Sequence, residues 1–135
     1  MPLLAWKEAY SVNVKEIDDQ HKKLIAMINE LNDAMAAGKA KEVLGEILAR
    51  LVSYTASHFA NEEKLMQTNG YEGFQDHKAK HEKMTVKVLD LQSQYQQGKA
   101  AMTIEVMNFL KNWLDKHILG TDMQYSAFLN SKGVR

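Results

Sequence analysis

Residues 74–97 read FQDHKAKHEKMTVKVLDLQSQYQQ, and this stretch decides the fold class. Its apolar and histidine positions recur alternately every three and four residues, which places them on one face of a helix. The stretch contains no proline and ends directly before Gly98, a residue type that commonly follows the last turn of a helix. We therefore predict one long helix over residues 74–97, whose buried face consists of Phe74, His77, His81, Met84, Val88, Leu91 and Tyr95.

The same spacing recurs in three further stretches, at about residues 18–37, 41–68 and 103–120. Ala, Leu, Met, Lys, Glu and Gln are abundant in the chain, and these residue types favour helices. No stretch alternates apolar and polar residues as a half-buried strand would. We expect an all-α fold, an antiparallel up-down-up-down four-helix bundle with short loops.

The two ends of the chain lack this regular spacing. Residues 1 to about 17 are predicted to form an irregular arm that lies over the bundle. The residues after Gly120 are predicted to form a short C-terminal turn or helix. A chain of 135 residues has the size of one domain, so we assign residues 1–135 to a single domain.

The composition excludes several classes of protein. Hydrophobic residues make up 45% of the chain and charged residues 25%, which is typical of a globular protein and not of a disordered one. The 17 basic and 17 acidic residues give a formal net charge of zero, whereas a general nucleic-acid binder carries a basic excess. The chain contains no cysteine, which excludes disulfides, zinc–thiolate sites, iron–sulfur clusters and a cysteine nucleophile.

The sequence also bears on location and assembly. No apolar run approaches the roughly 20 residues that a membrane span requires, and the first residues do not resemble a signal peptide. We therefore expect a cytoplasmic protein without a membrane span. The helix faces predicted at the surface mix Lys, Glu and Gln without a clear patch, so we expect a monomer.

All five histidines fall on the predicted buried faces, and Glu62 lies one turn beyond His58 on the same face. A single inward histidine usually bonds to a backbone group of the core. Five of them, together with a carboxylate, would bring more polar atoms into a small core than the other side chains could satisfy. A metal site explains the set better than a purely structural role. The histidines are His21, His58, His77, His81 and His117.

An internal repeat supports a shared site. The tripeptide Gly-Lys-Ala occurs at residues 38–40 and again at residues 98–100, 60 residues later. Each half contributes two histidines and one carboxylate at matching offsets of 59 or 60 residues, which indicates two helix hairpins related by a pseudo-two-fold axis. The matched pairs are His21 with His81, His58 with His117, and Glu62 with Asp122.

Asp122 requires an irregular helix to join this set. It follows His117 by five residues, so on a regular helix it would lie about 140° away around the axis. Gly120 lies between them and would either end the helix or permit a π-type bulge. Without such a break, Asp122 would be an ordinary surface acid.

The donor set indicates which metals fit and how many. Imidazole and carboxylate without thiolate favour iron, with manganese, zinc or copper as alternatives. If both carboxylates and one solvent-derived oxygen bridge two six-coordinate ions, the ion bound by His77, His81 and His117 has all its positions filled. The ion bound by His21 and His58 keeps one open position, where a small ligand such as O₂ would bind.

These residues form the pattern His21, His58-Phe59-x-x-Glu62, His77-x-x-x-His81 and His117-Ile118-x-x-x-Asp122. The pattern resembles that of the hemerythrins, and specifically their single-domain bacterial members. Asn13 departs from the glycine that such proteins often carry in the arm, which affects the local turn and not the site. Flanking residues also agree, namely Trp6, Val12 to Val14, Ile17, Asp18, Gln20, Trp113, Leu114 and Tyr125.

The resemblance implies a cofactor of two non-heme iron ions, Fe²⁺ or Fe³⁺, joined by an oxo or hydroxo bridge. It implies that His77, His81 and His117 bind one iron, that His21 and His58 bind the other, and that Glu62 and Asp122 bridge them. It further implies that O₂ binds end-on at the five-coordinate iron as hydroperoxide. The residues implied to line an apolar O₂ pocket, which could equally be plain core residues, are Leu24, Phe59, Trp113, Leu114 and Ile118.

Several functions are compatible with such a site. Reversible O₂ binding for carriage, storage or delivery fits best, because the inward faces offer no general acid or base beyond the ligands. An O₂ or redox sensor of a signalling protein is the alternative, favoured if the chain is an excised domain; the initial Met-Pro suggests a natural start. A di-iron oxidase or iron-repair enzyme is disfavoured, because di-iron oxygenase bundles usually carry four carboxylates and two histidines. A zinc or structural bundle would leave the open position without a use.

Overall fold

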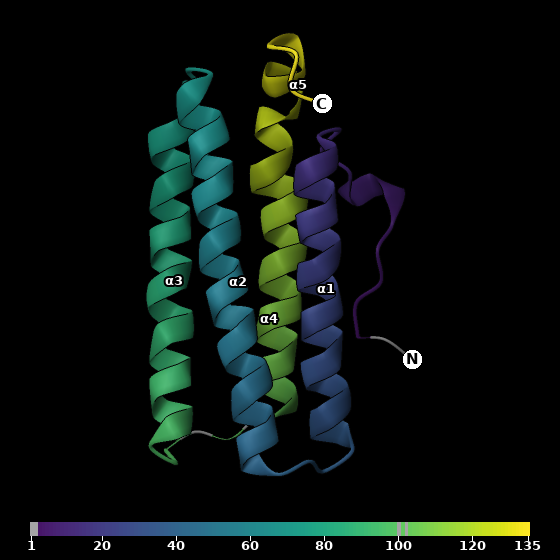
Figure 1. Cartoon of the computed structure of the whole chain (residues 1–135), viewed down its shortest axis with the longest axis vertical. Coiled ribbons are helices and arrows are strands. Elements are labelled where there is room, and N and C mark those ends of the chain that lie inside the picture. Colours follow the sequence, from purple (N-terminus) through teal and green to yellow (C-terminus); the bar gives the residue numbers. More distant parts are fainter. Residues whose placement is uncertain (1–2, 100, 102) are drawn as a thin grey trace.

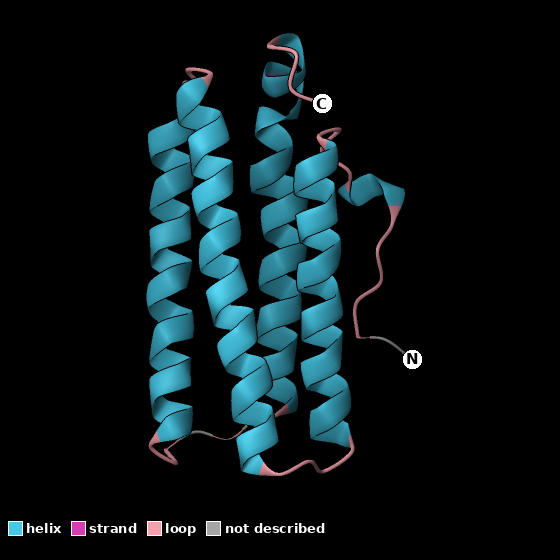
Figure 2. Ribbon diagram, in the orientation of Figure 1, coloured by secondary structure: helices cyan, strands magenta, loops and turns pink. Residues whose placement is uncertain are grey.

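The computed structural model describes residues 3–99, 101 and 103–135. Four long helices run side by side, and successive loops alternate between the two ends of the bundle (Figure 1). No strand occurs among the described residues, so the predicted all-α antiparallel bundle is confirmed (Figure 2). The elements are the short 3₁₀ turn η1 (Glu8–Tyr10), α1 (Lys15–Ala36), α2 (Lys41–Thr68), α3 (Phe74–Gln96), α4 (Ile104–Lys116), the π-helical turn η2 (His117–Asp122) and α5 (Met123–Ser131).

The Gly-Lys-Ala repeat marks two equivalent helix ends. Gly38 and Gly98 have φ angles of 68° and 74°, in the left-handed region that favours glycine. After each glycine, the lysine N–H turns back to a carbonyl of the last helical turn, at 3.0 Å for Lys39 and 2.8 Å for Lys99. Each repeat therefore ends one helix and begins a crossing to the next. Ala100 of the second repeat lies outside the described residues.

The fourth helix does not end at Gly120 as the sequence suggested. It continues from α4 through η2 and α5 to Ser131 without leaving helical geometry. Gly120 does not have a positive φ and sits inside the π turn. Of the two alternatives that the sequence left open at Gly120, a helix end or a π-type bulge, the structure has the bulge.

The N-terminal arm lies beside α1 and is tied to it by hydrogen bonds (Figure 1). Helix α1 begins at Lys15, somewhat earlier than predicted. The Asp18 carboxylate accepts from the Ser11 hydroxyl at 2.6 Å and from the Val12 N–H at 2.9 Å. Asn13, the residue after Val12, has a φ of 58°, a conformation that asparagine tolerates better than most residues. Asp18 thus holds the turn through which the chain enters the bundle.

Two apolar clusters fill the interior, and the polar site lies between them. The larger contains core residues of α1 to α4, including Phe59 and Leu114, together with Leu4 and Tyr10 of the arm and Ile118 of η2. The smaller cluster lies toward the other end of the bundle, where residues of the arm and α5 pack against α1 and α2. It consists of Val12, Val14, Ile17, Met66, Tyr125 and Leu129. Along α2, for example, Phe59 belongs to the larger cluster and Met66 to the smaller, so a side chain at position 62 lies between them.

Among the described residues, no helix has both the length and the apolar character needed to cross a membrane.

Candidate metal centre

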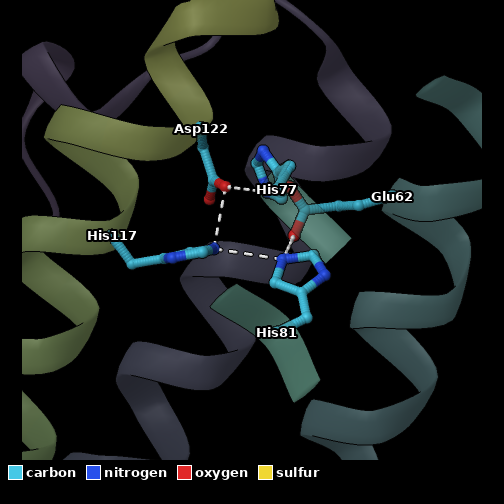
Figure 3. Close-up of side chains that lie close together, drawn as sticks. All are labelled: Glu62, His77, His81, His117 and Asp122. Atoms are coloured by element: carbon cyan, nitrogen blue, oxygen red, sulfur yellow. Dashed lines mark hydrogen bonds and ion pairs between the residues drawn. The ribbon is translucent and has the colours of Figure 1, made fainter. Parts of the chain in front are cut away.

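The structure brings all seven predicted ligand side chains together in the buried space between the two apolar clusters. Each of them is at most 5% exposed. Their donor atoms form two groups, within each of which the atoms lie inside 4.8 Å of one another. Glu62 and Asp122 belong to both groups. The first group adds His77, His81 and His117 (Figure 3), and the second adds His21 and His58.

Each helix of the bundle contributes to the centre at the same height. His21 comes from α1, and His58 and Glu62 come from successive turns of α2. His77 and His81 are one turn apart on α3, so both rings point inward from one face. Because the four amphipathic helices pack against one another, these side chains meet inside the bundle, and no loop has to supply them.

The π turn η2 places Asp122 on the same face of the helix as His117. A π helix has a wider turn than an α-helix, so residues five apart lie on the same face. His117 and Asp122 are the first and last residues of η2, and their Nε2 and Oδ1 atoms are 3.0 Å apart. Of the two ways in which the sequence could join Asp122 to the set, the structure has the bulge.

Asp122 is placed to bridge the two groups. Its Oδ1 atom lies 3.0 Å from Nε2 of both His77 and His117, on the three-histidine side (Figure 3). Its Oδ2 atom lies 3.0 Å from Nε2 of His21, on the two-histidine side. One carboxylate thus presents one oxygen to each group, which is the arrangement of a bridging ligand.

Glu62 also faces both groups, but less symmetrically. Its Oε1 atom lies 2.7 Å from Nε2 of His58 and 3.8 Å from Nε2 of His81. Its Oε2 atom accepts a 2.6 Å hydrogen bond from the Tyr125 hydroxyl, which reaches the centre from α5. The sequence pattern includes Tyr125 without a role, because the spacing does not show that its hydroxyl reaches Glu62 on α2.

The donor atoms are left unsatisfied by the protein itself. Buried polar atoms normally have a hydrogen-bond partner, and the few exceptions need an explanation. Seven buried atoms of the candidate ligands have no such partner among the described residues, and one of the seven is His21 Nδ1. The other six lie where a metal ion would satisfy them together. They are His21 Nε2, His58 Nε2, Glu62 Oε1, His77 Nε2, Asp122 Oδ1 and Asp122 Oδ2.

Two of the histidines are oriented by side chains that the sequence analysis missed. The Nδ1 atom of His81 lies 2.9 Å from a carboxylate oxygen of Glu63, and the Nδ1 atom of His58 lies 2.6 Å from the Gln20 amide oxygen. A proton on each Nδ1 leaves Nε2 free to face the centre. Gln20 precedes His21 in the quoted pattern and Glu63 follows Glu62, but spacing alone does not show that either reaches a ring on another helix.

The electrostatics of Asp122 and His81 favour the protonation states that bind a cation, whereas at His21 burial lowers the pKa but the hydrogen bond and charge of Asp122 outweigh it and raise the pKa. Burial raises the pKa of the Asp122 carboxyl, but the surrounding imidazoles of His117, His21 and His77 outweigh it, so this pKa lies well below its usual value. Burial lowers the pKa of His81 to about 3, against the opposing charge of Glu62. An ionised carboxylate and a neutral imidazole are the forms that act as metal ligands.

Three of the five predicted pocket residues meet at one cavity. Leu24, Trp113 and Leu114 line an almost wholly aliphatic space of about 20 Å³ in the larger cluster. A space of roughly 10–15 Å³ is enough for one water-sized molecule. Phe59 and Ile118 are buried but do not line this cavity. None of the seven candidate ligands lines it, and the assignment of all five residues to an O₂ pocket stays a prediction.

Comparison with known proteins agrees with this geometry. The hemerythrin HHE cation-binding domain matches residues 12–129. The chain belongs to the hemerythrin family. Among its hemerythrin relatives, the bacteriohemerythrin of Methylococcus capsulatus is 37% identical over 97% of this chain and all of the relative. The myohemerythrin of Theromyzon tessulatum is 32% identical over 92% of each chain.

Solved hemerythrin structures share the fold closely. A crystal structure of wild-type hemerythrin superposes with a TM-score of 0.90 at 37% sequence identity, covering 94% of this chain and 98% of the other. The sequence-based resemblance to the hemerythrins is therefore confirmed. It extends along nearly the whole bundle and is not limited to the histidine motif.

Proposed function

We propose that this hemerythrin binds two non-heme iron ions in the centre and uses them to bind O₂ reversibly. The observation that carries the proposal is the pair of unequal donor groups that share Glu62 and Asp122. His77, His81 and His117 would hold one iron, and His21 and His58 the other. The nitrogen and oxygen donors, with no sulfur among them, suit iron.

An iron pair held by these residues would supply the two electrons and the open coordination position that reversible O₂ binding requires. The protein residues supply the unequal ligand numbers that leave only one position open. The site lies between two apolar clusters, which keep bulk water away from it.

The surroundings of the centre favour binding over catalysis. The largely apolar cavity lined by Leu24, Trp113 and Leu114 offers no acid or base that could pass protons to a substrate. The Tyr125 hydroxyl is occupied by Glu62, and burial, with the charges of Glu62 and Asp122, holds its pKa well above its usual value. We therefore propose oxygen carriage, storage or delivery as the function, and not an enzymatic reaction.

Metal analysis together with an oxygen titration tests the proposal. Protein produced with iron should carry two irons per chain, and the reduced form should take up one O₂ per iron pair and release it under vacuum. An Asp122→Ala variant, which removes the carboxylate facing both groups, should lose iron and O₂ uptake. Full O₂ uptake by a chain without iron, or stable zinc in place of iron, would contradict the proposal.

A further inference from the structure

A cluster of lysines surrounds a hollow between α3 and α4, beside the candidate centre. The hollow has a volume of about 240 Å³. Met84, Trp113, His117 and Thr121 also line it. We call the four surrounding lysines the lysine surface: Lys80, Lys83 and Lys87 of α3, and Lys116 of α4.

The lysine surface is a local excess of positive charge on a chain whose formal net charge is zero. Its four lysines are exposed. Lys80 pairs with the carboxylate of Asp76 at 3.5 Å, and Asp90 and Glu105 line a neighbouring hollow with Lys87. Among the described residues, Lys83, Lys87 and Lys116 form no ion pair. Since like charges repel, this arrangement does not serve the stability of the fold, and it attracts anionic partners.

The hollow opens onto the most exposed histidine of the centre. His117 is 5% exposed, more than any of the other four histidines. The Trp113 ring stacks on His117 with 4.7 Å between centroids and an angle of 17° between planes, and both rings line the hollow. A molecule seated on the lysine surface would therefore contact stacked aromatic rings, one of which belongs to the candidate ligand set.

An O₂-binding iron pair needs an outside source of electrons, so this inference rests on the proposed function. If oxygen left the centre as hydrogen peroxide instead of as O₂, both irons would be left ferric, and two electrons from outside would then be needed to restore the ferrous pair. The chain contains no cysteine and therefore has no thiol or iron–sulfur cluster of its own to supply them.

We propose that the lysine surface is the docking site of an acidic one-electron carrier protein. Two successive encounters would each oxidise one carrier by one electron, and together they would return the ferric pair to the ferrous state. Lys80 and Lys87 are seven residues apart, about 10 Å along the helix, and Lys116 adds a second helix. The distance between these lysines is larger than a single phosphate-sized anion. It suits a carrier protein whose surface has acidic side chains around its bound cofactor.

Reduction kinetics test this docking site. A plant-type [2Fe–2S] ferredoxin serves as the acidic carrier, mixed anaerobically with the oxidised, iron-loaded protein at low ionic strength. The double variant Lys83→Glu/Lys87→Glu should lower the second-order rate constant at least about tenfold, and high salt should remove most of the difference. The matched control is Lys39→Glu/Lys99→Glu, which makes the same charge change in exposed loops at the far end of the bundle and should stay within about twofold of the wild type.

Binding is measured separately from electron transfer. Calorimetry with oxidised ferredoxin and the oxidised protein allows no reaction, and the Lys83→Glu/Lys87→Glu variant should bind at least about tenfold more weakly than the control. Iron content and O₂ uptake are checked in each variant, so a failure of the proposed function is seen independently. Equal rates and affinities in both variants, or an equal loss in both, would overturn the proposal.

Discussion

The side chains that contact the Nδ1 atoms of His81 and His58 differ in charge. His81 on the three-histidine side faces the carboxylate of Glu63, whereas His58 on the two-histidine side faces the neutral amide of Gln20. A carboxylate partner makes an imidazole a stronger donor than an amide does. The structure therefore favours firmer binding of the metal on the three-histidine side, which is the side expected to have no open position.

Removal of the Glu63 carboxylate should weaken this binding. We expect Glu63→Ala to lower iron affinity about 10- to 100-fold, because the His81 ring loses the partner that orients it. Competition with a chelator measures the change. Glu82→Ala is the control, since Glu82 lines the same groove between α2 and α3 but makes no such contact. Equal iron retention in the Glu63→Ala variant and the wild type would show that the contact does not matter.

Tyr10 gives the fold a pH dependence away from the centre. The Tyr10 hydroxyl donates to the Asp115 carboxylate, joining the arm to α4, and burial with this neighbouring charge raises the pKa of Tyr10 to about 12. A raised pKa means that the neutral phenol stabilises the fold below pH 10 and that this contribution is lost between about pH 10 and pH 12. It amounts to at most about 3 kcal/mol, since one pKa unit corresponds to about 1.4 kcal/mol.

The comparison with Tyr10→Phe isolates this effect. At pH 7 the variant should unfold at a lower temperature than the wild type, because Asp115 loses a donor. The two melting temperatures should converge as the pH rises from 10 to 12, since only the wild type loses the contribution. Thermal unfolding followed by circular dichroism measures both curves, and a constant difference up to pH 12 would refute the assignment.

At the scale of elements, the π turn decides whether the centre is complete. The sequence shows that Asp122 needs an irregular helix, because five residues do not span a whole number of α-helical turns. It does not show which irregularity occurs, since Gly120 is compatible with a helix end and with a bulge. The packing of α5 residues such as Tyr125 and Leu129 into the smaller cluster keeps the chain helical beyond the turn.

Gly120 itself should be dispensable. Its φ is not positive, and a Cβ added there would meet no atom within 4 Å. We expect Gly120→Ala to keep full iron content and to raise the free energy of unfolding by up to about 1 kcal/mol, the usual helical difference between the two residues. Metal analysis and chemical denaturation measure these quantities. Loss of iron in this variant would show that glycine is required for the π turn.

At the scale of the whole molecule, the sequence predicts residues that recur at regular positions along one helix. It does not predict side-chain contacts between different helices. Six of the seven candidate ligands were found because they lie on apolar faces at a regular spacing, and Asp122 was found because it matches Glu62 in the second half of the repeat. Gln20, Glu63 and Tyr125 were missed, because each acts on a residue of another helix. The lysine surface was missed for the same reason: the sequence shows no patch, and α3 and α4 create it only when they pack together.

Removal of the metal should destabilise the whole bundle. The centre leaves three carboxylate oxygens and several imidazole nitrogens buried without hydrogen-bond partners among the described residues, and metal binding would satisfy them only in the folded chain. We expect chelation to lower the melting temperature by at least about 10 °C, since each kcal/mol corresponds to about 3 °C or more in a chain of this size. Calorimetry before and after chelation measures the shift. Identical melting curves would mean that the centre does not hold a metal in the folded protein.

The most direct test of the central claim is a visible spectrum of the iron-loaded, reduced protein through repeated cycles of O₂ and argon. The account predicts a nearly colourless reduced form, a visible band that appears with O₂ at one O₂ per two irons, and loss of that band under argon over several cycles. A band that appears once and then persists under argon as the oxidised form would contradict reversible O₂ binding.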